Sequence, residues 1–98
     1  MLTLEEVKNN LRIDSDADDT YLEMLIETSS AFILATLEIQ LDEEMTLVTT
    51  DPRFKTLQFM LVSNWFEHRV ATTSAMQQEV PFTITAMIHQ LRGVGVVG

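Results

Sequence analysis

The sequence predicts an all-α domain: a small bundle of about four helices built around one long central helix. Apolar residues recur at helical spacing along most of the chain, and its 98 residues include only 3 Gly and 2 Pro. Two stretches also open with helix-start signals. A chain of this length makes one domain, and without cysteine its core forms without disulfides. We therefore treat residues 1–98 as a single domain.

The central helix is predicted to begin at Asp51, which suits an N-cap, and Pro52, which suits the first helical position. At about 100° per residue, one apolar stripe contains Phe54, Leu57, Leu61 and Trp65, and a second arc lies beside it. Apolar surface this wide needs partners on two sides. We therefore expect part of it to contact another copy of the protein, with a candidate self-assembly interface formed by Phe59, Val62, Phe66 and Arg69.

The first helix is predicted over Leu2–Leu11, where Thr3 and Glu6 have the spacing of a capping box. The second begins near Asp18 and runs to about residue 38, with small residues at 28–31 that permit close approach of another helix. Its outer face is expected to carry Glu23, Glu27 and Glu38.

Between these two helices, alternating acids at Asp14, Asp16 and Asp18 resemble the start of a calcium-binding loop. The sixth position is Asp19 instead of Gly, and the twelfth is Leu25 instead of Glu. The acids are therefore interpreted as a helix start favoured by the helix dipole.

Two connections are predicted to be extended loops, around residues 40–50, where β-branched residues gather, and around 72–80, which is polar. Pro81 then opens a last helix whose buried face is expected to hold Ile84, Met87, Ile88 and Leu91. The tail at 93–98 is short and Gly-rich, so we expect it to be flexible.

The net charge of −9 is unevenly distributed. Residues 1–51 hold thirteen acidic and two basic residues, a net charge of −11, whereas residues 52–98 hold two acidic and four basic residues, a net charge of +2. An acidic chain is poorly suited to binding nucleic acid phosphates. The two halves could meet head to tail in neighbouring copies, or the acids could simply keep the surface hydrated.

No enzyme chemistry is predicted. His68 and His89 fall on separate helices without metal-ligand spacing, and the chain has no cysteine and no Gly-rich phosphate loop. We therefore expect an interaction protein with no catalytic residues, no cofactor and no metal. Neither a signal peptide nor an apolar run long enough to span a membrane is present, so no membrane partner is expected.

The order of the motifs resembles the phage head–tail connector family, the small head-completion adaptors of long-tailed double-stranded DNA phages and prophages. The resemblance covers LTLEEVKNNLRID, the acidic cluster, YLEMLIETSSAFI, and FKTLQFMLVSNWFEHRVA with its Trp65, Phe66, Glu67 and Arg69. A Val80-Pro81 pair before a short helix ending in Leu-Arg also matches. Two departures are Leu37-Glu38-Ile39, where the family often has Thr-Gly, and Phe66, where it usually has Tyr.

This resemblance implies a structural virion protein that forms a ring of about a dozen copies through head-to-tail contacts. The ring would join the portal to a tail-side stopper or tail-completion protein at the capsid vertex, completing the head after DNA packaging. Assembly would take place in the bacterial host cytoplasm, and DNA would only pass through the lumen. Glu23, Glu27 and Glu38 are then candidate lumen-facing acids, because an acidic lumen repels phosphates.

Two alternatives come from other classes. One is a small acidic helical regulatory or inhibitory binding module, a nucleic-acid mimic or antitoxin-like inhibitor, supported by the net charge. The other is a minor enzyme subunit, which the missing site chemistry disfavours. The mass in solution separates them, because a connector forms rings or a concentration-dependent oligomer whereas an inhibitor of this kind stays monomeric.

Overall fold

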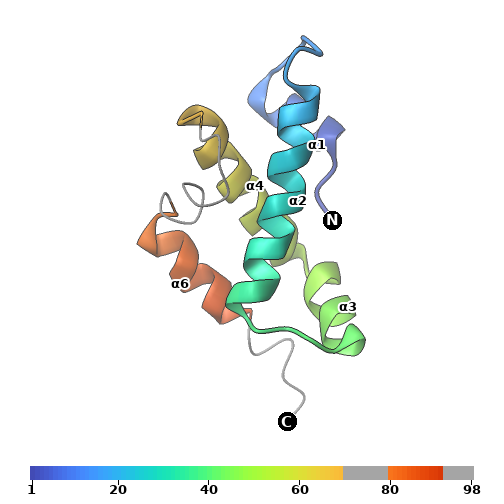
Figure 1. Ribbon diagram of the computed structural model, residues 1–98, viewed down its shortest axis with the longest axis vertical. Helices are drawn as coiled ribbons and strands as arrows, with labels where there is room; N and C mark the ends of the chain where they lie inside the picture. The colour runs from blue at the N-terminus through green and yellow to red at the C-terminus, as the bar shows by residue number, and fades with distance from the viewer. Residues whose placement is uncertain (70–79, 92–98) are drawn as a thin grey trace.

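Five helices make up the part of the chain that the computed structural model describes, residues 1–69 and 80–91, and this part contains no strand (Figure 1). The predicted all-α class is confirmed. In chain order the helices are α1 (Leu4–Leu11), α2 (Asp19–Thr36), α3 (Asp42–Thr50), α4 (Pro52–Glu67) and α6 (Phe82–Gln90).

Helix α4 is the central element, as predicted, because it packs against α2, α3 and α6. Its start follows the sequence signals: Pro52 occupies the first turn, and the Arg53 N–H donates to the Asp51 carboxylate at 2.8 Å. The predicted stripe is sealed, with Phe54, Leu57, Leu61 and Trp65 at most 2% exposed.

The most extensive helix pair in the bundle is α2 with α4, which run antiparallel (Figure 1). The buried face of α2 presents Leu22, Leu25, Ser29 and Ile33. The fully buried hydroxyl-bearing residue Ser29 lies within 3.2 Å of the Gln58 side chain of α4. Small residues at mid-helix therefore permit the close approach that the sequence predicted, and the approaching helix belongs to the same chain.

Helix α1 has the predicted capping box: the Glu6 N–H donates to Thr3 Oγ1 at 3.2 Å, and the Thr3 N–H donates to Glu6 Oε1 at 3.1 Å. Leu2 and Val7, at the ends of a hydrophobic staple, are both buried. The helix ends at Arg12, whose φ of 58° turns the chain away.

The prediction of an extended loop around 40–50 is wrong, because residues 42–50 form α3. The β-branched run there is accommodated by hydrogen bonds from threonine hydroxyls to carbonyl oxygens four residues earlier. Thr46 donates to Asp42 at 3.0 Å, Thr49 to Met45 at 2.7 Å, and Thr50 to Thr46 at 2.7 Å. The acidic first turn also suits the helix dipole.

Helix α6 begins just after Pro81 and buries Ile84, Ile88 and Leu91, as predicted. Met87 was predicted to share that face, but it is 38% exposed and lies at the edge of the contact. The predicted loop at 72–80, except for Val80, and the predicted flexible tail at 93–98 lie outside the described residues.

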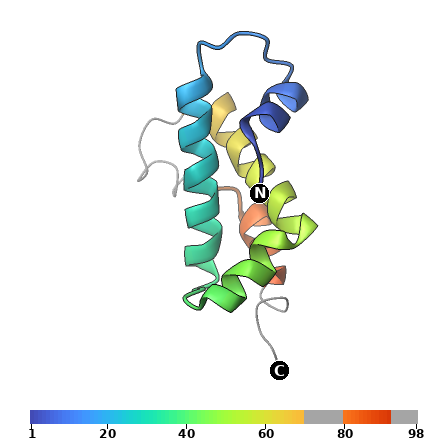
Figure 2. The same cartoon turned by 90° about the vertical axis from the view of Figure 1, so that its right-hand side faces the viewer.

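Viewed from two directions, α3 and α6 lie on opposite flanks of the pair formed by α2 and α4 (Figures 1 and 2). The two flanking helices therefore face different sides of the molecule. None of the described helices is long and apolar enough to span a lipid bilayer.

Candidate assembly surfaces

The end of α4 is attached to the start of α2 through Arg69. Its guanidinium donates to both carboxylate oxygens of Asp18, at 3.1 and 3.3 Å, and its Cζ lies 4.6 Å from the centroid of the Phe66 ring and 5.7 Å from that of Tyr21. Asp18 is the N-cap residue of α2, but its side chain makes no capping hydrogen bond and is bound by Arg69. The hydrogen bond to Asp18 raises the pKa of Arg69.

The aromatic residues of this signature hold the two helices together. Trp65 is fully buried and meets the ring of Phe32 edge to face at 6.2 Å. Phe66 lies 6.1 Å from Tyr21, whose hydroxyl donates to the Trp65 carbonyl at 3.4 Å. The aromatic-acidic-x-Arg signature at residues 65–69 therefore makes contacts within the subunit. We call these contacts of Trp65, Phe66 and Arg69 with α2 and its N-cap the clamp; they join segments about fifty residues apart in the chain.

This clamp changes the interpretation of the candidate self-assembly interface. Val62 is fully buried in the core, so it is not available to a neighbour. Phe66 and Arg69 contact Tyr21 and Asp18 of the same chain. Phe59 is half-buried beside a shallow hollow between α1 and α4 and packs against the core, whereas the Arg69 side chain is 60% exposed.

The expectation that α4 carries surplus apolar surface is wrong for most of that surface, because α2, α3 and α6 cover it within one chain. Large apolar side chains are exposed instead on the flanking helices. Phe82 is 85% exposed on α6, while Leu41, just before α3, and Leu47, within it, are 62% and 43% exposed. Periodicity could not assign these exposures, because it does not say how far a short helix is covered by its neighbours.

The candidate lumen acids are all exposed, but they do not share one helical face. Glu23 and Glu27 lie one turn apart on α2. Glu38 lies beyond the end of α2 at Thr36, where it adopts a φ of 57°. Glycine is the residue that adopts a positive φ at a helix end most readily.

The acidic cluster before α2 is partly neutralised from α1. Lys8 Nζ lies 2.8 Å from the carboxylates of Asp16 and Asp19, and these contacts raise the pKa of Lys8 and lower that of Asp16. Across residues 1–69 and 80–91, no three or more His, Cys, Asp or Glu side chains gather where they could hold a metal ion. His68 and His89, the two histidines, are both exposed and lie at the ends of different helices.

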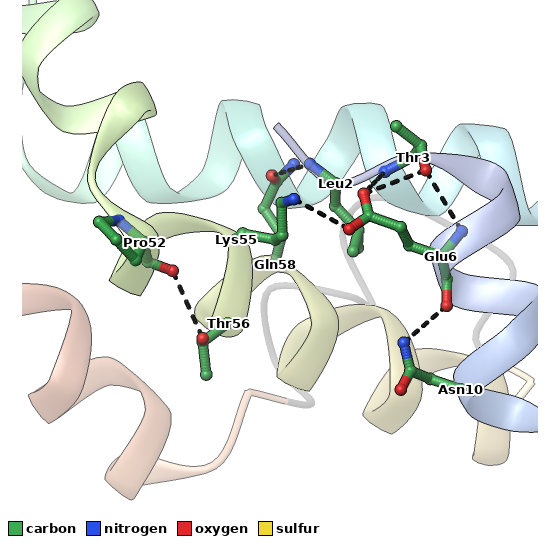
Figure 3. A network of polar contacts seen from close by, with 8 residues as sticks. All are labelled: Leu2, Thr3, Glu6, Asn10, Pro52, Lys55, Thr56 and Gln58. Atoms are coloured by element: carbon green, nitrogen blue, oxygen red, sulfur yellow. Dashed lines mark hydrogen bonds and ion pairs between the residues drawn. The ribbon is translucent and has the colours of Figure 1, made fainter.

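Gln58 is a buried polar connector that the sequence reasoning missed. Its Oε1 accepts the Leu2 N–H at 3.0 Å (Figure 3). Its Nε2 donates to the Ile26 carbonyl at 3.3 Å and to Ser29 Oγ at 3.2 Å. One fully buried side chain thus joins α4, α2 and the segment before α1. The sequence signal was its position: at about 100° per residue, Gln58 falls between the apolar stripe of α4 and the second apolar arc beside it.

Above this connector, an ion pair joins α1 to α4 at the surface. Lys55 Nζ lies 2.9 Å from Glu6 Oε2, while Glu6 Oε1 is used in the capping box with Thr3 (Figure 3). The hydrogen bond from Lys55, followed by those from Thr3, lowers the pKa of Glu6. Glu6 therefore caps its own helix and fixes that helix on the central one.

Comparison with known proteins gives one family match. The family model described as phage gp6-like head-tail connector protein matches residues 1–92. A search of curated proteins found no match, and neither did a search of solved structures. The match covers every helix that the structure describes.

Proposed function

We propose that this chain, which belongs to the phage gp6-like head-tail connector family, forms a ring adaptor between the portal and the tail-side proteins at the capsid vertex. Membership makes the chain a structural component of the virion that contacts other virion proteins, and the family is not enzymatic. The observation that carries the proposal is the extent of the match, which includes all the described helices.

The proposed ring completes the head after DNA packaging and receives a tail-side stopper or tail-completion protein. Assembly takes place in the bacterial host cytoplasm, and the product stays in the virion. About a dozen copies close the ring through head-to-tail contacts. DNA meets the protein only in transit through the lumen.

The distribution of ion pairs supports an inner surface that does not hold DNA. Four of the described basic side chains are engaged by carboxylates within the subunit: those of Lys8, Arg53, Lys55 and Arg69. Glu23, Glu27 and Glu38 are exposed and make no ion pair in the described part of the chain. Because DNA affinity comes largely from basic side chains, we propose that these three acids face the lumen and let DNA slide past.

Reconstitution on heads tests the function. DNA-filled heads from a phage whose copy of this gene is disrupted are mixed with the purified protein and then with tails. We expect electron microscopy to show the protein at one vertex, and we expect tail joining and infectivity to be restored. A protein that stays off the heads would overturn the proposal, and a monomer that inhibits a nuclease would favour the acidic inhibitor instead.

A variant with Glu23→Gln, Glu27→Gln and Glu38→Gln tests the lumen assignment separately. It should still occupy the vertex but should slow DNA ejection, because the neutralised surface repels phosphates less. Replacing Glu5 by Gln and Asp14 by Asn is the control, because both acids are exposed, lie in or just after α1 and make no ion pair in the described part of the chain. Equal ejection rates for the triple variant and the unmodified protein would remove these acids from the lumen.

A further inference from the structure

The outer face of α6 carries no charge in an otherwise acidic chain. Opposite its buried side, α6 exposes Phe82, Ala86 and His89, and the sequence Phe82–Gln90 contains no Asp, Glu, Lys or Arg. A single exposed apolar residue is ordinary. An 85% exposed phenylalanine on a whole helix face without charged residues is the pattern of a surface covered by a partner.

A second apolar surface lies on the opposite flank. Leu41 and Leu47 are exposed there beside Asp42 and Glu43, and neither acid has an ion pair within the described residues. Helix α3 is held to the rest of the subunit mainly through α4. Each subunit thus presents one uncharged aromatic surface on α6 and one acidic aliphatic surface on α3, two helices that lie on different sides of α2 (Figure 1).

We propose that the outer face of α6 in one copy of this chain binds α3 of the next copy. Two observations select a second copy as the occupant. The surfaces lie on opposite flanks, and a contact between two different surfaces of identical subunits can repeat around a ring. Their charges also favour this pairing, because two α3 surfaces would oppose like charges, whereas the sequence of α6 contains no acidic residue.

This inference rests on the proposed function, since it names the contact that closes the ring. Each surface has only one or two large apolar side chains, so a single contact is small by the standard of stable interfaces. When the ring closes, every subunit has two such contacts, and the last contact forms within a single assembly, so it does not require another molecule to bind. Isolated subunits are therefore expected to associate weakly and to form rings on the portal, where they are brought close together.

Cysteine cross-linking tests the pairing directly, because the natural chain has no cysteine. Leu47→Cys and Phe82→Cys variants are assembled on heads, separately and mixed, and then oxidised. We expect disulfide-linked dimers from the mixture, a ladder of higher species from the double variant, and no dimers from either variant alone. Met24→Cys, on α2 with 38% exposure, replaces either partner as the matched control and should give no cross-link.

Charge substitution gives an independent measurement. Phe82→Glu should weaken ring assembly at least about tenfold, because it places a carboxylate opposite the acids of α3. Adding Glu43→Lys should restore part of the loss, whereas Met24→Glu should change assembly little. Circular dichroism of each variant establishes that the helices remain folded.

The outcomes separate this inference from the proposed function. Rings that occupy the vertex but give no cross-link between positions 47 and 82, or that tolerate Phe82→Glu, would overturn the α6–α3 pairing and leave the connector function standing. Cross-links within either single variant would indicate a symmetric contact and would also overturn it. Failure of the unmodified protein to occupy the vertex would overturn both.

Discussion

Gln58 shows how one polar residue can fix the arrangement of a small apolar core. Its amide satisfies the Leu2 N–H, which would otherwise be buried without a partner, and it also meets Ile26 and Ser29 of α2. An apolar residue at this position would pack against α2 as well, but it would not select one register between α2 and α4. A buried polar group whose hydrogen bonds are satisfied favours one arrangement of the core over others.

We expect Gln58→Leu to lower the free energy of unfolding by about 1–3 kcal/mol, because the Leu2 N–H loses its partner in the core. Urea denaturation measures the change, and Gln90→Leu, at an exposed position on α6, is the control with the same substitution. In the double variant with Ser29→Ala the two losses should not add, since the side chains share a hydrogen bond. Stability equal to that of the natural protein would mean that these hydrogen bonds only offset the desolvation of the amide.

Glu38 adopts a backbone conformation that is unfavourable for a residue with a side chain. It follows the end of α2 with a φ of 57°, and the next residue, Ile39, donates its N–H to the Leu34 carbonyl at 3.0 Å. This hydrogen bond closes the helix end in the manner that glycine usually permits. A Cβ in this region of φ/ψ space raises the energy of the folded chain.

Glu38→Gly should therefore raise the free energy of unfolding by about 1 kcal/mol, by removing that strain. The control is Glu27→Gly, which makes the same substitution inside α2 and should lower stability by about 1 kcal/mol. Thermal unfolding of the two variants under one buffer gives the comparison. If both variants lose stability, the turn at position 38 is not strained.

At the scale of the element, α3 is the helix that the sequence pattern did not predict. Its threonines and valine favour extended structure, and only Val48 of its nine residues is buried. The helix exists because threonine hydroxyls bond back along it and because it packs on the start of α4. The other helices have stronger local signals: a capping box for α1, an Asp-Pro start for α4 and regular apolar spacing for α2 and α6.

Helix α3 buries one side chain, as α1 does, but it lacks the capping box of α1, so it should be the least stable element of the described fold. We expect Val48→Ala to cost about 1–3 kcal/mol and to make the amides of α3 exchange with solvent before those of α2 and α4. Hydrogen exchange resolved along the chain measures both effects. Leu47→Ala, at the neighbouring exposed position, should change stability by less than about 0.5 kcal/mol, and equal protection of α3 in the Val48→Ala variant would contradict this view.

For the whole molecule, the position of the acids matters more than their number. Several of them meet the few basic residues of the chain: Glu6 binds Lys55, Asp16 binds Lys8, and Asp51 binds Arg53. Hydrogen bonds from these bases lower the pKa of each of the three carboxyl groups. A carboxyl group with a lower pKa in the folded state stabilises the fold above its ordinary pKa, and this contribution is lost as pH falls through the folded value.

The urea midpoint should consequently fall as the pH is lowered below the ordinary carboxyl values, 4.5 for Glu6 and 3.8 for the two aspartates. Glu6→Gln should have a lower midpoint than the natural protein near neutral pH and a shallower decline in acid. Glu5→Gln is the control, because it makes the same charge change in the same helical turn at a residue without an ion pair in the described part. Identical pH profiles for the two variants would show that the pair with Lys55 contributes no stability.

The sequence alone determined the features that depend on near neighbours in the chain. The capping box at Thr3 and Glu6, the start of α4 at Asp51 and the buried stripe ending at Trp65 follow from spacings of a few residues, and the structure confirms each of them. The order of motifs also indicated the family, because that order is itself a property of the linear chain.

Only the tertiary structure decided which surfaces are covered. It placed Val62 in the core, gave Arg69 a partner fifty-one residues away at Asp18, made Gln58 a connector, and left Phe82 exposed. The physical reason is that helical periodicity defines the faces of one helix, whereas burial depends on which other segments pack against those faces. Among the five described helices, side chains that are distant in the sequence determine which helix faces pack together.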